Sequence, residues 1–163
     1  MIFGMSLLLF VHVALSIIGI ATGLVVLHGF ITGSSNGPWP FAFLASTILT
    51  SATGFPLPAT QLLPSHIVGA VSLILLAIAV AALYVYRLDG AWRSTYVASS
   101  VAALYLNVFV GVVQAFQKLP FLTPLAPTQS EAPFLFAQVF TLALFIVLGI
   151  LAVKRFVPRL REA

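Results

Sequence analysis

The sequence predicts an all-α integral membrane protein, a single bundle of five transmembrane helices, and three observations lead to that class. Of its 163 residues, 61% are hydrophobic and 6% are charged, whereas ordinary soluble domains are roughly 45–50% apolar and about 25% charged. The mean hydropathy is +1.17. The apolar residues also fall into long runs, several of them near the roughly 20 residues with which a helix crosses a bilayer. These observations exclude a soluble domain and a disordered chain.

Four of the runs are long enough to cross a membrane without strain: residues 6–31, 67–86, 96–116 and 134–153. A fifth run, residues 41–55, lies between Pro40 and Pro56 and reaches only about 22 Å at ~1.5 Å per residue. We expect this fifth run to span the membrane with help from its flanking residues. The alternative is four spanning helices and a re-entrant half-helix, which would have to be packed inside the protein.

The connectors between the runs are short and rich in turn-forming residues. They cover residues 32–40, 56–65, 87–95 and 117–133. None of them is long enough to separate two domains. We therefore expect residues 1–163 to form one transmembrane helical domain that ends in a basic tail, residues 154–163.

The basic residues predict the orientation of the chain. The formal net charge is +4, and four of the seven basic residues lie in the tail: Lys154, Arg155, Arg159 and Arg161. Arg87 and Arg93 lie in the connector 87–95. Because basic loops stay in the cytoplasm, we expect this connector and the C-terminus to be cytoplasmic. Such a tail sets orientation or touches anionic lipid, so the expected partner is the bilayer and not a nucleic acid.

Small residues predict where the helices pack against each other, because lipid gives helices no hydrophobic reason to associate. Ser16, Gly19 and Gly23 lie on one face of the first helix, at spacings of three and four residues. Gly111 follows Asn107 by one helical turn later in the chain. We expect Ser16, Gly19, Gly23 and Gly111 to lie at helix–helix contacts.

Polar side chains from different helices are predicted to meet in the outer half of the bundle. By helical rise, His12 lies roughly 9 Å inside the outer end of the first helix, and His66 opens the third helix at a similar level. Asn107 marks the midplane. The candidate ligand-binding residues are His12, Thr50, His66, Asn107, Gln114 and Gln138.

Several functions fit this polar cluster. The leading hypothesis is a non-enzymatic membrane protein that uses the cluster to bind an apolar ligand, such as a quinone, or a partner membrane subunit or second copy of the chain. The alternative is a redox protein that carries b-type haem between His12 and His66 and exchanges electrons with quinone. A polar network that only fixes the helix register explains the same residues without a ligand. A permease for a neutral solute would need an aqueous path past Asn107.

The absence of certain residue types from the apolar runs argues against ion transport, catalysis and zinc binding. Asp, Glu, Lys and Arg are absent from all five apolar runs, whereas ion pumps and ion-coupled transporters usually place ionisable groups at depth. No carboxylate pair lies in the membrane, so we expect no catalytic residues. The chain has no cysteine, and two histidines alone rarely complete a zinc site. We therefore expect no metal ligands apart from the histidines of the haem alternative.

Three stretches of the sequence form a recognisable pattern. They are TSATGFPLPATQLLPSHIVG at residues 50–69, ALYLNVFVGVVQAFQKLP at 103–120 and LAPTQSEAPFLFAQ at 125–138. Together they resemble a group of small bacterial inner-membrane proteins that are described only as hypothetical. The resemblance covers residues 12–155, and LAPTQSEAPF is its most specific part. It implies a bacterial inner-membrane location and the same topology, and it carries over no activity, cofactor or site.

Overall fold

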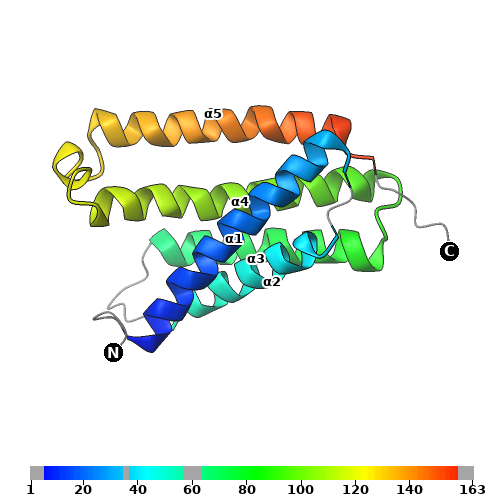
Figure 1. Ribbon diagram of the computed structural model, residues 1–163, viewed down its shortest axis with the longest axis horizontal. Coiled ribbons are helices and arrows are strands. Elements are labelled where there is room, and N and C mark those ends of the chain that lie inside the picture. The colour runs from blue at the N-terminus through cyan, green and yellow to red at the C-terminus, as the bar shows by residue number, and fades with distance from the viewer. Residues whose placement is uncertain (1–5, 35–36, 57–63, 158–163) are drawn as a thin grey trace.

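The computed structural model describes residues 6–34, 37–56 and 64–157, and these residues contain helices and no β-strand (Figure 1). The helices are α1 (Leu7–Thr32), α2 (Trp39–Gly54), α3 (Pro64–Val80), α4 (Ala91–Lys118) and α5 (Ala132–Arg155). A π-helical segment, η1 (Ala81–Val85), continues α3, and one 3-10 turn, η2 (Thr123–Leu125), lies between α4 and α5. The predicted all-α class is confirmed, and each of the five predicted runs forms a helix.

Four of the described helices are long and apolar enough to cross a membrane. They are α1, the continuous segment His66–Val85 of α3 and η1, α4 and α5. Helix α2 has 16 residues and extends about 24 Å at ~1.5 Å per residue. It is the short element that the two flanking prolines predict. Length and composition thus indicate a multi-pass membrane protein.

Successive helices run in opposite directions. On α1, the Cβ position of Gly19 adjoins Thr47 of α2, and that of Gly23 adjoins Phe43. Residue numbers therefore rise along α1 as they fall along α2. Helix α3 returns alongside α2, and α5 returns alongside α4 (Figure 1).

Helix α1 crosses the other helices diagonally (Figure 1). Near its C-terminus it packs on α5, where the ring centroids of Phe30 and Phe156 lie 4.9 Å apart. Near its N-terminus it packs on the end of α2, where His12 adjoins Gly54. Helix α1 therefore crosses α4 near the middle of both helices and diverges from α4 toward the N-terminus of the chain.

The two ends of the bundle differ in charge. One end, which we call the basic end, holds the start of α4 and the C-terminus of α5. It carries Arg87, Asp89, Arg93, Lys154 and Arg155. The opposite end, which we call the histidine end, holds His12, His66 and the loop between α4 and α5.

Two element boundaries at the basic end differ from the prediction. The sequence predicts a turn over residues 87–95, whereas α4 begins at Ala91. Polar residues can be helical there because backbone groups pair within the helix whatever surrounds the side chains. Helix α5 likewise runs through Lys154 to Arg155, so the predicted tail 154–163 begins as helix. The other two basic residues of that tail lie outside the described residues.

The ends of the helices are set by local residues. Ser6 caps α1, because its hydroxyl accepts a hydrogen bond from the backbone N–H of Leu9 at 3.3 Å. Helix α1 ends at Gly33, whose left-handed φ of 67° suits glycine. Pro40 and Pro133 lie in the first turns of α2 and α5, where a missing N–H costs no helical hydrogen bond.

The tightest packing lies between the middle of the bundle and the basic end. The almost fully buried large side chains there are Val26, Phe30, Phe43, Leu76, Tyr96, Val97 and Leu104. Phe30 meets Tyr96 edge to face, with ring centroids 5.4 Å apart, an arrangement worth about 0.5–1.5 kcal/mol beyond the buried area. At the histidine end, a smaller cluster of Phe116, Ala126 and Phe134 holds the α4–α5 loop.

Candidate functional site

The two predicted cluster histidines lie at the same end of the bundle, and both contact the C-terminal end of α2. The Nδ1 atom of His12 is 3.1 Å from Thr53 Oγ1, and a Cβ at Gly54 would lie 3.4 Å from His12 Cε1. The ring centroids of His66 and Phe55 are 5.9 Å apart. Contacts with the C-terminal end of α2 thus explain the position of both imidazole rings. A haem bound between the two histidines stays a prediction.

Polar side chains of three helices lie close together in the middle of the bundle. The hydroxyl of Ser16 on α1 donates to Asn107 Oδ1 on α4 at 3.0 Å. Gly19 lies one turn further along α1 and has no side chain. As a result, Thr47 Oγ1 and Asn107 Nδ2 come within 2.9 and 3.0 Å of the point where a Cβ of Gly19 would lie. We call Ser16, Gly19, Thr47 and Asn107 the central node.

The central node also contains buried polar atoms that lack a partner. Thr47 is 1% exposed and Asn107 is 8% exposed, and neither Thr47 Oγ1 nor Asn107 Nδ2 has a hydrogen bond within the described part of the chain. A buried polar group left unpaired costs about 1–3 kcal/mol. Because both atoms adjoin Gly19, the node exists only while position 19 carries no side chain.

The other predicted cluster residues do not converge on this node. Gln138 is buried on α5, and its Nε2 donates to the backbone oxygen of Phe109 on α4 at 3.3 Å. The hydroxyl of Thr50 is used within α2, where it donates to the backbone oxygen of Ser46 at 2.8 Å. Gln114 is exposed, contrary to the expected inward position. The reason is the diagonal course of α1, which has diverged from α4 at this level (Figure 1).

Four polar contacts between helices are found among the described residues, and each joins a different pair of helices. The contacts are His12 with Thr53 for α1–α2, Ser16 with Asn107 for α1–α4, Ser51 with Ser72 for α2–α3, and Gln138 with the Phe109 backbone for α4–α5. In lipid such interhelical hydrogen bonds contribute about 0.6 kcal/mol each on average. This arrangement indicates separate stabilising contacts between pairs of helices and not one shared binding pocket. A ligand-binding role for these residues stays a prediction.

The glycines that the sequence assigns to packing differ in how closely a neighbour approaches. A Cβ at Gly23 would lie 2.5 Å from Leu104 Cδ1 and 2.9 Å from the ring of Phe43, so the space beside it is filled. A Cβ at Gly111 would lie 3.6 Å from Ile20 Cδ1, which is an ordinary contact distance. The close approach of α1 therefore occurs at Gly19 and Gly23 and not at Gly111.

The loop before α5 is held by Glu131. Its carboxylate accepts hydrogen bonds from the N–H of Thr128 at 3.1 Å, from the Thr128 hydroxyl at 2.8 Å and from the N–H of Ser130 at 3.1 Å. Desolvation acts to raise the pKa of Glu131, but the hydrogen bonds together outweigh it and hold the pKa below its ordinary value. The Glu131 carboxylate thus stabilises the conformation of its own loop.

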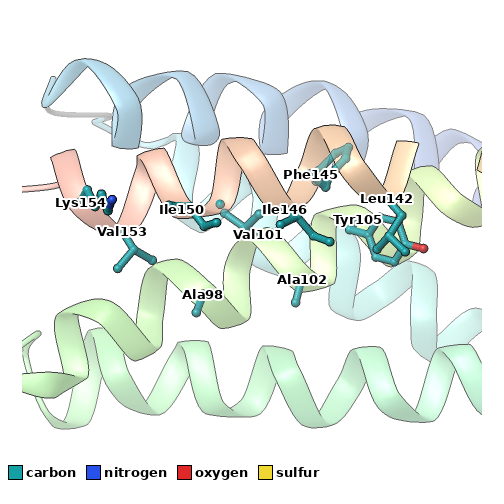
Figure 2. A pocket seen from close by; sticks show the side chains of 11 residues that line it. Ala98, Val101, Ala102, Tyr105, Leu142, Phe145, Ile146, Ile150, Val153 and Lys154 are labelled. Carbon is teal, nitrogen blue, oxygen red and sulfur yellow. The ribbon is translucent and has the colours of Figure 1, made fainter. Parts of the chain in front are cut away.

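A groove of about 470 Å³ lies between α4 and α5 (Figure 2). Ala98 and Ala102 line it from α4, and Ile146 and Ile150 line it from α5. Of the described residues that line it, Lys154 is the only charged one. The groove is therefore lined by apolar side chains and by the ammonium group of Lys154. It lies apart from the predicted polar cluster.

Small residues on α4 create this groove, and the sequence analysis did not find it. Ala98 and Ala102 are one helical turn apart, and in Figure 2 Ala102 lies across from Ile146 and Ala98 lies across from Ile150. Gly149 lets the helices approach closely, since its Cβ would lie 3.4 Å from Val101 Cγ1. In the sequence the groove is visible only as the pair Ala98 and Ala102. Two alanines one turn apart also occur where helices pack tightly, so the pair does not predict a groove until the position of α5 is known.

No protein-family model matches the chain, and neither a curated protein nor a solved structure is similar to it. The candidate sites therefore depend on their own geometry.

The Ser16–Asn107 hydrogen bond predicts an energetic coupling between α1 and α4. In a double-mutant cycle of Ser16→Ala and Asn107→Ala, we expect a coupling free energy of about 0.6 kcal/mol. The measurement is the free energy of unfolding of each purified variant in detergent. Gln114→Ala changes an exposed amide on the same helix and should shift stability by less than about 0.5 kcal/mol. A fully additive cycle would show that this hydrogen bond contributes nothing.

Proposed function

We propose that the chain is a non-enzymatic polytopic protein of a bacterial inner membrane that binds an apolar ligand in the groove between α4 and α5. The observation that carries this proposal is the groove itself. Its volume of about 470 Å³ lies within the roughly 300–1,000 Å³ of small-molecule sites. Its walls are apolar side chains from two helices, and its one charge can orient a ligand.

The size of the groove favours a small ligand over a partner subunit or a second copy of the chain. The groove follows α5 from Leu142 to Lys154, which is about 18 Å at ~1.5 Å per residue. A partner helix that lay along the groove and spanned the hydrocarbon core of about 30 Å would extend well beyond the groove. One flexible apolar chain fits the shorter length.

The proposal places the ligand away from the polar cluster that the sequence suggests. His12, Asn107 and Gln138 each have a hydrogen-bond partner on a neighbouring helix, which supports a structural role for that cluster. The redox alternative has less support, because His12 lies within hydrogen-bonding distance of Thr53 on α2 and His66 packs against Phe55, the residue after α2.

We also propose that α2 crosses the membrane, so that five segments traverse it and the C-terminus is cytoplasmic. The ends of α2 adjoin opposite halves of α1, since Gly54 lies beside His12 and Phe43 beside Gly23. A re-entrant segment would instead return to the side where it began. The short length of α2 is tolerated if the bilayer thins locally or flanking residues reach the interface. The basic end then faces the cytoplasm, as basic loops do.

Single-cysteine labelling tests this topology, because the chain has no native cysteine. Ser34→Cys lies between α1 and α2, and Ser130→Cys lies just before α5; both serines are exposed. We expect a membrane-impermeant maleimide to label Ser130→Cys in intact spheroplasts and Ser34→Cys only after lysis. Labelling of both before lysis would identify α2 as re-entrant, and the reversed pattern would overturn the orientation.

Filling the groove tests the binding function. Ala102→Phe places a large ring in the groove, whereas Ala77→Phe places the same ring on an exposed position of α3. After addition of phosphatidylcholine, native mass spectrometry measures the fraction of protein that retains lipid. We expect this fraction to fall severalfold in Ala102→Phe and to stay unchanged in Ala77→Phe. Equal retention by both variants and the native chain would contradict the proposal.

A further inference from the structure

We infer that the groove between α4 and α5 holds one acyl chain of an anionic phospholipid, with the phosphate headgroup at Lys154. The inference rests on the proposed function and names the ligand class of the same groove. It follows from where the charge lies, how long the groove is, and which charges surround the end at which Lys154 lies.

The charge that the described lining of the groove carries, on Lys154, lies at one end. Figure 2 shows Lys154 at that end and Tyr105 and Leu142 at the other, with apolar side chains of α4 and α5 between them. A ligand that satisfies every part of this lining needs a long apolar portion and one anionic group at its end. Phospholipids have this structure, and they are the main component of the bilayer around the protein.

The length of the groove matches one leaflet. From Leu142 to Lys154 the groove extends about 18 Å at ~1.5 Å per residue. Half of a hydrocarbon core of about 30 Å is about 15 Å. Lys154 lies one residue before the end of α5, at the level where a transmembrane helix leaves the core. When the headgroup of a lipid contacts Lys154, its acyl chain therefore reaches the bilayer midplane near Tyr105.

The charges around Lys154 favour an anionic headgroup. Arg87, Arg93 and Arg155 lie at the same end of the bundle, and Asp89 is the acidic residue that the described part of the chain places there. Basic pockets between transmembrane helices on the cytoplasmic side attract anionic headgroups. A zwitterionic headgroup would bring its own cation into this positive surrounding.

The headgroup must supply most of the selectivity, because the acyl chain gains little by leaving the bilayer. Lipid tails are as apolar as the groove walls, so no hydrophobic driving force distinguishes the two environments. Packing against Ala98 and Ala102 holds any chain of suitable length. Lys154 is the group that distinguishes an anionic lipid from a neutral one.

A competition between two lipids with identical acyl chains tests the inference on the full-length protein. Native mass spectrometry measures retained phosphatidylglycerol against retained phosphatidylcholine. We expect the native chain to prefer phosphatidylglycerol about fivefold, the effect of one interfacial basic residue, and to lose that preference in Lys154→Gln. Arg155→Gln removes a neighbouring charge that does not line the groove and should keep most of the preference. The preference should also weaken as salt is raised.

The outcomes separate this inference from the proposed function. If the native chain shows no preference, or if Lys154→Gln and Arg155→Gln lose it equally, the headgroup site at Lys154 is refuted while the groove stands. If Ala102→Phe retains both lipids as well as the native chain does, the groove itself binds nothing and both proposals fail. Thermal unfolding of each variant checks that the fold is intact.

Discussion

The structure depends on the close approach of α1 to α2 and α4 at two residues that have no side chain, Gly19 and Gly23. Lipid provides no hydrophobic force between helices, so association comes from tight packing and from hydrogen bonds between helices. At these glycines, side-chain atoms of the neighbouring helices come within 2.5 to 3.0 Å of the place where a Cβ would lie. Only at this separation can Ser16 reach Asn107.

Among the described residues, four polar side-chain contacts join one helix to another, and other hydroxyls, such as those of Thr22 and Thr141, donate to the backbone of their own helix. Each contact joins one helix pair and stabilises it by about 0.6 kcal/mol on average, so no single one dominates. A polar side chain already paired within the bundle has less capacity to recognise a ligand. This is why we assign ligand recognition to the basic end, where the exposed Lys154 closes an apolar groove.

Hydropathy predicts the five helices well, because the length of an apolar run is fixed by the membrane that it must cross. It does not predict which polar residues meet. Gln114 lies two turns from Asn107 on the same face of α4, so periodicity predicts that both turn inward, yet α1 crosses α4 at an angle and Gln114 is exposed. The groove escapes sequence analysis for the same reason: Ala98 and Ala102 line a cavity only because of how α5 packs against α4.

Substitution of Gly19 by leucine tests the close approach most directly. A Cβ at position 19 would lie 2.9 Å from Thr47 Oγ1 and 3.0 Å from Asn107 Nδ2, so a large side chain there must push α1 away from α2 and α4. We expect Gly19→Leu to lower the free energy of unfolding in detergent by about 1–3 kcal/mol, and Ala21→Leu, at an exposed position of the same helix, to change it by less than about 0.5 kcal/mol. Unchanged stability of Gly19→Leu, or an equal loss in both variants, would contradict the close approach.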